Sequence, residues 1–474
     1  MNILLVRPPD PLQHVTLLSH TKPMNLAYLA AYLRRCGFEV FIADFETSPY
    51  SDSSLLSILR ERAPRVVGIS CVTPTIRNGA AISALAKEYD RNIVTVIGGP
   101  HANGLPEETL EEFRAFDYLV YGEGEVTFAE LCRHIMEGSA CTSLQGLVLR
   151  EDGSIRKNPP RQLIETLDSI PFPARDLIQA QNPTGHSTRG IPNRLRSTEI
   201  YTSRGCPYGC SFCAIQTTFG SRVRFRGIGY IEEEIRQVMR DFPFDHLVIA
   251  DDTFTLARDR AFELCDVFRR NGIRSWNCDT RVNGVSRDLL KYMAESGCQK
   301  VAFGVESGSQ RIIDRIGKKI RVDQVREAVR WAKEAGIRQI EGNFIIGSDP
   351  EETAEDVAMT EQLLKELPWT FVSVSVIVPY PGTPVYREMR EKGLIADDAD
   401  WEDFVMFGKY PKWRTTHFPS SDLINMQKRL TRKFYLNTSY IARRLMAVRS
   451  WGEMKYWFSA GAAYLKWYLY GRLR

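Results

Sequence analysis

Two blocks of the chain, in which short apolar runs alternate with amphipathic helical patterns, restrict the fold more than any other sequence feature. In the first block the apolar runs cover residues 3–6, 39–43, 66–70, 93–98 and 118–121. Parallel strands need helical crossovers between them, and those crossovers are right-handed. We therefore predict an open, doubly wound, Rossmann-like parallel sheet over residues 1–140, with ligands beyond the carboxyl ends of its strands.

The second block, residues 194–384, shows the same alternation six times. Its strands are expected to begin near residues 198, 247, 275, 300, 339 and 372, each but the last followed by a helical pattern. This order predicts a partial (β/α)6 TIM-like barrel, so the whole chain belongs to the α/β class. In barrels of this kind the chemistry lies at the carboxyl ends of the strands.

A connector and a tail complete the expected organisation. Residues 141–193 contain Asp152-Gly153 between two short apolar runs, which predicts a hairpin, followed by a proline-rich linker. Residues 385–474 are expected to be mostly helical. Their last part, 428–474, holds eleven Lys or Arg and one acid, interleaved with aromatic residues. Such helices either lie on an anionic membrane surface or pack over the barrel mouth, and no nucleic-acid recognition module accompanies them.

Length and composition indicate a multidomain cytoplasmic protein. At 474 residues, two or three domains are expected. The net charge of +4 gives no sign of nucleic-acid binding. The ten cysteines include seven scattered singly, which favours a reducing compartment over a disulfide framework. The chain begins with a run typical of a strand, not of a secretion signal, and no stretch of about 18 apolar residues predicts a membrane-spanning helix.

Cys206, Cys210 and Cys213 follow the first expected barrel strand in a C-x3-C-x2-C pattern. Three thiolates can hold three irons of a [4Fe–4S] cluster and leave the fourth iron open to a substrate or cofactor. The alternative is a structural zinc site, which needs a fourth ligand, and no second cysteine or histidine pair follows. The spacing and its place at the barrel rim favour the cluster.

This motif resembles the signature of the radical S-adenosylmethionine (SAM) enzymes, and the aromatic Phe212 before the third cysteine fits it too. In that family SAM chelates the open iron. The resemblance implies cofactor contacts at the other strand ends: an ammonium site, a carboxylate partner, a ribose segment and a residue near adenine. They are Asp251, Asp252 and Thr253 for the ammonium, Arg281 for the carboxylate, Glu306 and Ser307 for the ribose, and Asn343 near adenine.

The loops after the strands of the first block resemble those of the cobalamin-binding domain that precedes the barrel in cobalamin-dependent radical SAM enzymes. The expected cobalamin contacts are Ser70, Thr73, Thr75, Gly98, Gly99, His101, Gly122, Glu123 and Glu125. The Asp-x-His-x-x-Gly loop that ligates cobalt in other cobalamin domains is absent after the first strand, where the chain reads Arg-Pro-Pro-Asp-Pro-Leu-Gln-His. We therefore expect no histidine of this loop on the metal, and none from His101. The alternative is an inert Rossmann-like domain.

The resemblance implies an enzyme that cleaves SAM to a 5′-deoxyadenosyl radical, which takes hydrogen from an unactivated carbon. Methyl transfer from methylcobalamin then follows, or else oxidative cyclisation or rearrangement without methylation. A cofactor-binding sensor without turnover and a zinc-stabilised scaffold are the alternatives outside this class. An electron donor such as flavodoxin or ferredoxin is expected. The aromatic tail hints at a large apolar small-molecule substrate: a lipid, a terpenoid or a tetrapyrrole.

Overall fold

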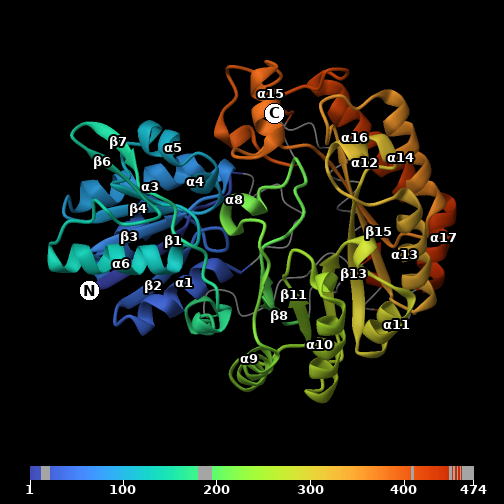
Figure 1. Cartoon of the computed structure of the whole chain (residues 1–474), viewed down its shortest axis with the longest axis horizontal. Coiled ribbons are helices and arrows are strands. Elements are labelled where there is room, and N and C mark those ends of the chain that lie inside the picture. Colours follow the sequence, from blue (N-terminus) through green and yellow to red (C-terminus); the bar gives the residue numbers. More distant parts are fainter. Residues whose placement is uncertain are drawn as a thin grey trace.

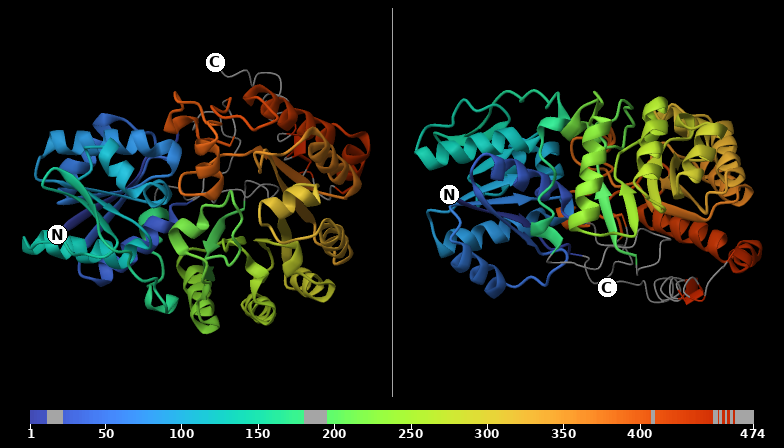
Figure 2. Two further views of the ribbon diagram at one scale, coloured as in Figure 1. Left: turned by 45° about the horizontal axis from the view of Figure 1, so that its top comes forward. Right: turned by 90° about the horizontal axis from the view of Figure 1, so that it is seen from below.

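The computed structural model describes residues 1–11, 22–179, 195–406 and 410–447, together with residues 451, 454, 455, 457, 458 and 461. The loop around His14, the last part of the linker and most of residues 448–474 lie outside the described residues. The chain forms two lobes, each built around one sheet, with the C-terminal helices on the second lobe (Figures 1 and 2).

The first lobe contains a seven-stranded sheet in the order β2-β1-β3-β4-β5-β6-β7. Its first five strands are parallel, as predicted. Because β2 and β3 lie on opposite sides of β1, the strand order reverses at the β1–β3 boundary, which is where such sheets bind ligands. The strands are β1 (Asn2–Arg7), β2 (Glu39–Asp44), β3 (Val66–Ser70), β4 (Val94–Gly98), β5 (Tyr118–Val120), β6 (Leu147–Glu151) and β7 (Ser154–Lys157).

The last two strands of this sheet are the predicted hairpin. Asp152 and Gly153 at its turn have φ values of 50° and 79°, the backbone that a type I′ turn requires. β6 pairs antiparallel with β5, so the sheet of the first lobe continues to residue 157.

Helices cover both faces of this sheet (Figure 1). One face packs against α1 (Met24–Arg35) and α6 (Gly124–Glu137), through buried residues such as Leu33 and Leu131. The other face packs against α2 (Asp52–Arg62), α3 (Ile76–Tyr89) and α5 (Pro106–Glu112). Two short elements follow strand ends: a 3-10 turn, η1 (Thr73–Thr75), and the one-turn helix α4 (Pro100–Gly104).

The second lobe is a six-stranded parallel sheet whose strands follow one another in chain order. β8 and β15 do not pair, so the predicted partial (β/α)6 barrel is confirmed and is open along one side. Its strands are β8 (Ser197–Ile200), β11 (His246–Ile249), β12 (Trp276–Thr280), β13 (Cys298–Glu306), β14 (Gln339–Ile346) and β15 (Phe371–Val376). Its outer helices are α9 (Ile228–Asp241), α10 (Arg258–Arg270), α11 (Arg287–Glu295), α12 (Gln310–Arg315), α13 (Val322–Glu334) and α14 (Ala354–Glu366).

Alternation along the barrel strands separates an apolar outer face from a polar lumen. Ile249, Cys278 and Phe303 belong to the core beneath the outer helices. Residues of the opposite phase, such as Asp279, face the lumen, because successive side chains on a strand point to opposite sides. Lys300 on β13 and Glu341 on β14 form an ion pair of 2.5 Å, and the charged atoms are buried.

Side chains from other elements cover both free edges of the barrel. On β8, Arg175 donates a hydrogen bond to the Glu199 carbonyl at 2.7 Å, and Lys22 donates one to the Ser197 carbonyl at 3.5 Å. On β15, Gln427 and Tyr435 of α16 (Ser420–Tyr435) donate to the carbonyls of two valines at 2.9 and 2.8 Å.

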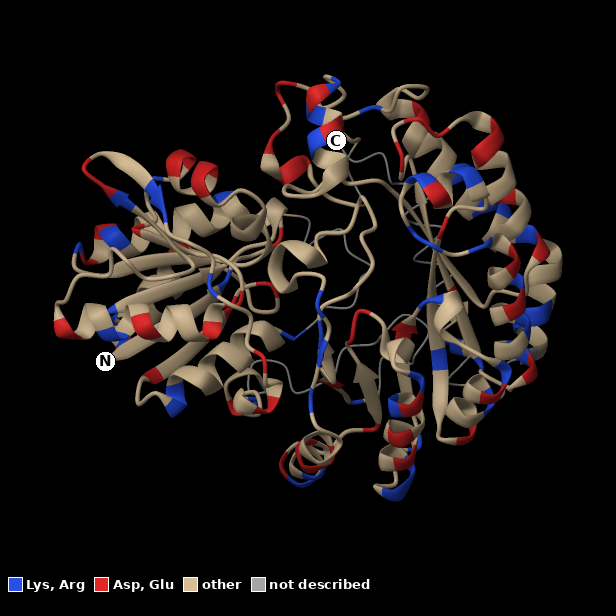
Figure 3. Ribbon diagram, in the orientation of Figure 1, with Lys and Arg blue, Asp and Glu red and all other residues tan. Residues whose placement is uncertain are grey.

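The C-terminal region is helical, as predicted. It contains α15 (Pro384–Glu391), α16 and α17 (Thr438–Ala447). Within the described residues, no helix is both long enough and apolar enough to cross a membrane. Acidic and basic residues are intermixed along the outer helices of the barrel (Figure 3).

Candidate active site

The carboxyl ends of the two sheets face each other across the junction of the lobes. Asn103 in α4, which follows β4, donates a hydrogen bond to Thr218 in α8 (Ile215–Phe219) at 2.6 Å. Gly104 lies so close to the loop after β15 that a Cβ there would come within 2.5 Å of the Pro381 carbonyl oxygen. Loops that both folds use for ligands therefore meet at one interface.

The three cysteines lie in the loop between β9 (Ser203–Arg204) and α8, at the barrel rim. Cys210 is buried, and Cys206 and Cys213 are half-buried. Burial is the main cause that raises the pKa of the Cys213 thiol to about 11; a backbone hydrogen bond from Ile215 opposes the rise, and the charges of Cys210, Cys206 and Asp252 contribute to it. The three sulfurs are thus near enough to influence one another. No three His, Cys, Asp or Glu side chains in the described ranges are close enough to hold a single metal ion as they stand.

Asp251, expected to receive the ammonium group of SAM, instead supports the cysteine loop. Its carboxylate accepts hydrogen bonds from the backbone N–H groups of Thr202 at 2.6 Å and Ser203 at 3.1 Å, and from both hydroxyls. Burial raises the pKa of the Asp251 carboxyl, and these four hydrogen bonds lower it in part. With its oxygens occupied, Asp251 fixes the backbone that leads to Cys206.

Asp252, the next residue, has the opposite character. Its side chain reaches solvent at the barrel mouth, but the surrounding protein desolvates it in part, and this, together with the charges of Asp251 and Asp279, raises its pKa to about 6. It also contributes to the electrostatics of Cys213. Thr253 is buried and donates its hydroxyl to the Asp252 carbonyl. Of the two neighbouring acids, only Asp252 offers an accessible carboxylate beside the thiols.

Arg281 lies against the cysteine loop and not beside an open carboxylate site. Its Nη1 is 3.8 Å from the Cys210 sulfur, within range of an N–H···S hydrogen bond, and its guanidinium lies 3.6 Å from the centroid of the Tyr208 ring. A further nitrogen donates to the Lys318 carbonyl. The structure therefore places Arg281 against Cys210 of the cysteine motif, and its predicted contact with the SAM carboxylate stays a prediction.

The ends of β13 and β14 carry the remaining residues expected near SAM. Glu306 has a left-handed backbone, with φ of 71°, and forms a buried ion pair of 2.6 Å with Lys318, whose ammonium lies 6.0 Å from the Phe212 ring centroid. Ser307 is buried, and its hydroxyl forms a hydrogen bond with the hydroxyl of Thr360 on α14. Asn343 is half-buried and pairs in register with Gly304 and Ser373.

The loops expected to hold cobalamin lie together at the carboxyl edge of the first sheet. Gly99 follows Gly98 with φ of 95°, and a Cβ there would come within 2.8 Å of the Cys71 carbonyl and the Ser70 hydroxyl. Gly122 has φ of 80° and open space beside it. Thr73 and Thr75 are buried in η1, and Ser70 accepts a hydrogen bond from Asn25 at 3.0 Å.

His101 is buried at this edge, and neither of its ring nitrogens has a hydrogen-bond partner among the described residues. Its ring packs edge-to-face with that of Trp401, with centroids 4.9 Å apart. Burial lowers the pKa of His101 to about 4, so the ring is neutral. A buried imidazole normally has a hydrogen-bond partner. The unpartnered ring of His101 therefore fits an edge at which a ligand binds.

Glu123 and Glu125, both expected to contact cobalamin, form ion pairs across the lobe junction instead. Arg204 contacts Glu123 at 2.8 Å and Glu125 at 2.6 Å, and Arg224 contacts Glu123 at 2.6 Å. All four side chains are at most 12 % exposed. The sequence analysis missed both arginines, because no motif marks them and their partners lie about 80 to 100 residues earlier.

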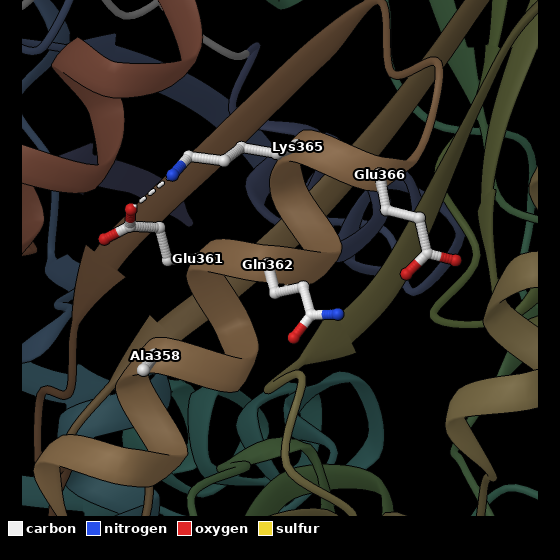
Figure 4. A pocket seen from close by; sticks show the side chains of 5 residues that line it. All are labelled: Ala358, Glu361, Gln362, Lys365 and Glu366. Carbon is white, nitrogen blue, oxygen red and sulfur yellow. Dashed lines mark hydrogen bonds and ion pairs between the residues drawn. The ribbon is translucent and has the colours of Figure 1, made fainter.

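The donor groups fit the cofactors that the motifs predict. Three thiols on one short rim loop suit three irons of a cluster, whereas one zinc ion would draw every thiol to about 2.3 Å. The edge of the first sheet offers open backbone at Gly122, an unpartnered His101 and the exposed side chain of Val72, which suit a large, flat ligand. By contrast, the depression lined by Ala358, Glu361, Gln362, Lys365 and Glu366 lies on the outer helix α14, away from both edges (Figure 4).

Residues 15–132 match the model of the B12 binding domain, and residues 200–364 match that of the radical SAM superfamily. An uncharacterized methyltransferase of Pyrococcus horikoshii is 33% identical over 94% of both chains. The cytidylyl-2-hydroxyethylphosphonate methyltransferase of Streptomyces wedmorensis is 28% identical over 83% of this chain and 82% of its own. The anaerobic magnesium-protoporphyrin IX monomethyl ester cyclase of Rubrivivax gelatinosus is 26% identical over 93% and 78%.

Two solved structures share the fold. The radical SAM methyltransferase TsrM of Kitasatospora setae, with cobalamin and a [4Fe–4S] cluster bound, has a TM-score of 0.68 and 21% identity over 82% of this chain and 75% of its own. The cobalamin-dependent SAM radical enzyme OxsB has a TM-score of 0.76 and 17% identity over 98% and 71%.

The chain therefore belongs to the cobalamin-dependent radical SAM enzymes. Its cofactors are a [4Fe–4S] cluster, SAM and cobalamin, and its relatives include methyltransferases and cyclases. The predicted family, cofactors and α/β fold class are confirmed.

Proposed function

We propose that this enzyme transfers a methyl group to an unactivated carbon of a small molecule. The observation that carries the proposal is the junction of the lobes, where the cysteine loop and the carboxyl edge of the first sheet meet through α4, α8 and the pairs of Arg204. The relative of highest identity reported above is named a methyltransferase. A methyl donor on one lobe and a radical initiator on the other need this proximity.

When bound, the reduced cluster supplies the electron that cleaves SAM, and cobalamin supplies the methyl group. Cys206, Cys210 and Cys213 are the proposed cluster ligands. Asp252 would accept the ammonium group of SAM, because its carboxylate is accessible beside Cys213. Asn343 and Ser307 are proposed to line the adenosine side. Asp251 positions the loop, and Gly98, Gly99, Gly122 and His101 are proposed to border the corrin.

The second candidate is oxidative cyclisation or rearrangement without methylation, since a cyclase aligns with 93% of this chain. The two reactions consume SAM differently. Methylation would consume two molecules of SAM: one as the source of the methyl group, which leaves S-adenosylhomocysteine, and one as the source of the radical, which leaves 5′-deoxyadenosine. Cyclisation releases 5′-deoxyadenosine alone.

The test is a product analysis of anaerobic, reconstituted enzyme with hydroxocobalamin, SAM and a chemical reductant. Methyl transfer predicts that both S-adenosylhomocysteine and 5′-deoxyadenosine accumulate. If 5′-deoxyadenosine alone appears, the cyclase candidate replaces methyl transfer. If neither compound forms while both cofactors are bound, the protein is a sensor and the proposal is wrong.

We further propose that the substrate is apolar and that the C-terminal helices meet an anionic membrane surface. On α17, Ile441 and Leu445 lie one turn apart and are 41% and 58% exposed, and Met446 is 78% exposed. Arg443 is exposed beside them. Apolar side chains flanked by cations are typical of helices that lie in a membrane interface.

A small redox protein is the proposed electron donor.

A further inference from the structure

The four charged side chains at the lobe junction connect two loops that the reaction must hold together. Glu123 and Glu125 follow β5 of the first sheet, and Arg204 stands two residues before Cys206. Arg224 lies on β10 (Arg224–Phe225), which pairs antiparallel with β9. One chain of ion pairs thus runs from the edge of the first sheet to the start of the cysteine loop.

The geometry of Arg204 is that of a fixed bridge. Its two terminal nitrogens bind two different carboxylates, Glu123 and Glu125, so the guanidinium cannot turn without losing one of them. Tyr28 of α1 and Phe219 of α8 place their rings 5.9 and 5.6 Å from the guanidinium. These rings come from the first lobe and from the segment after the cysteines, so both lobes enclose the same cation.

The charges at this bridge balance. Burial by itself would raise the pKa of the Glu125 carboxyl, but the charge and hydrogen bond of Arg204 outweigh burial, and the pKa is lowered. Two carboxylates face two guanidiniums at this bridge, and loss of Arg204 would leave Glu125 buried without its ion-pair partner.

The bridge is also held from the barrel side. Asp251 binds the backbone of Thr202 and Ser203, directly before Arg204. Gly205 then turns with φ of 91°, where a Cβ would come within 2.5 Å of the Arg222 carbonyl. The segment from Thr202 to Gly205 thus has one side bound to the barrel and the other to the first sheet. A buried ion pair is weak evidence for stability, so we assign these pairs a role in fixing the arrangement of the two loops.

We propose that Arg204 is a positioning residue that, through Glu123 and Glu125, sets the separation and orientation of the cluster relative to cobalamin. This inference rests on the proposed function for the reason why the placement of the two cofactors matters. The placement itself is measurable without turnover. It also gives the two glutamates a role other than contact with cobalamin. A misplacement of about 1 Å can cost about 100-fold in rate, so such a bridge matters for methyl transfer.

The test uses the full-length protein, with reconstituted cluster and hydroxocobalamin reduced to its paramagnetic Co(II) form. The magnetic interaction between the reduced cluster and Co(II) is measured by pulsed EPR, and bound iron and cobalamin are counted in the same samples. Arg204→Lys keeps the charge but can serve only one carboxylate well, and Glu125→Gln keeps the shape but removes one charge. Arg222→Gln is the matched control, since it breaks the exposed pair with Glu165 in the same strand region.

We expect the wild type and Arg222→Gln to give one narrow distance distribution. Arg204→Lys and Glu125→Gln should give a broader or shifted distribution with unchanged iron and cobalamin contents. An unchanged distribution in both variants would overturn the proposal. So would loss of cobalamin from Glu125→Gln with full retention in Arg204→Lys, because the glutamate would then act on the corrin. Should the wild type form neither S-adenosylhomocysteine nor 5′-deoxyadenosine, the proposed function fails while the EPR result stands.

Discussion

The guanidinium of Arg281 lies 3.8 Å from the sulfur of Cys210. This arginine is buried, and it is held in place by the Tyr208 ring and the Lys318 carbonyl. Reduction adds an electron to the cluster, and a neighbouring positive charge or N–H donor favours that step. With Cys210 as a proposed cluster ligand, we expect Arg281 to influence the reduction potential of the cluster.

Arg281→Gln should shift the midpoint potential of the cluster to more negative values, because it removes a positive charge beside a ligating sulfur. The midpoint potential of Arg281→Lys, which keeps the charge, should lie between those of Arg281→Gln and the wild type. An EPR-monitored redox titration measures the potential. Arg287→Gln, on an exposed part of α11, is the control. Equal potentials for Arg281→Gln and the wild type would refute this role.

Replacing Cys206, Cys210 and Cys213 together by Ala should abolish the brown colour of the reconstituted protein and its bound iron, because no other thiolate set replaces them. Bound cobalamin should remain, since the first lobe holds it. Iron, sulfide and cobalamin assays on one sample measure both. Cys36→Ser, a half-buried cysteine after α1, should keep the cluster. Full iron content in the triple variant would contradict the assignment.

Substitution by Asn should lower the stability of the protein much more at Asp251 than at Asp252. Asp251→Asn weakens four buried hydrogen bonds and should destabilise the protein by about 2 kcal/mol, seen in thermal unfolding. Asp252→Asn should change stability by less than about 0.5 kcal/mol, because its side chain is exposed.

The affinity for SAM should change when Asp252, the proposed ammonium site, is replaced. Asp252→Asn should raise the Kd for SAM about tenfold, the equivalent of about 1.4 kcal/mol for one lost charge-assisted contact. Equilibrium binding of radiolabelled SAM to reconstituted protein measures the Kd. An unchanged Kd would remove Asp252 from the proposed ammonium site.

Glu352, which is fully buried, should make stability depend on pH. Burial raises its pKa from 4.5 to about 8, and the charges of Asp356 and Asp349 add to the rise. A pKa raised in the folded state means that stability is greatest below about 4.5 and is lost as the pH rises through about 8. The melting temperature of Glu352→Gln should therefore rise relative to that of the wild type as the pH increases from 5 to 9. A constant difference across that range would contradict this prediction.

Membrane contact through α17 predicts binding to vesicles of phosphatidylglycerol and weak binding to vesicles of phosphatidylcholine. Replacing Ile441, Leu445 and Met446 together by Ser should abolish co-sedimentation with the anionic vesicles. Met359→Ser on α14, which is 50% exposed before substitution, is the control and should bind like the wild type. Equal partitioning of the triple variant and the wild type would end the membrane proposal.

The sequence was sufficient for the fold because both blocks alternate apolar strands with helices, a pattern with few topological solutions. It also placed the cysteines at the rim, since Cys206 follows the first barrel strand closely. It could not assign Asp251 and Arg281, because residue type at a strand end does not say whether a side chain faces a ligand or a neighbouring loop. Asp251 turns to the loop before the cysteines, and Arg281 turns to Cys210.

The ion pairs of Glu123 and Glu125 could not be predicted for a related reason. Carboxylates after β5 suit hydrogen bonds to an amide-rich ligand, and only the packing of the lobes shows Arg204 opposite them. Contacts between residues so far apart in the sequence leave no local pattern.

The side chains that cover the edge of β8 have a consequence for how the barrel can exist in isolation. The Ser197 and Glu199 carbonyls are occupied by Lys22 and Arg175, both of which precede the barrel. A barrel produced without those residues would present bare peptide groups along a strand, and such a strand recruits the strands of other molecules. The first lobe and the linker together thus protect this strand from pairing with other molecules.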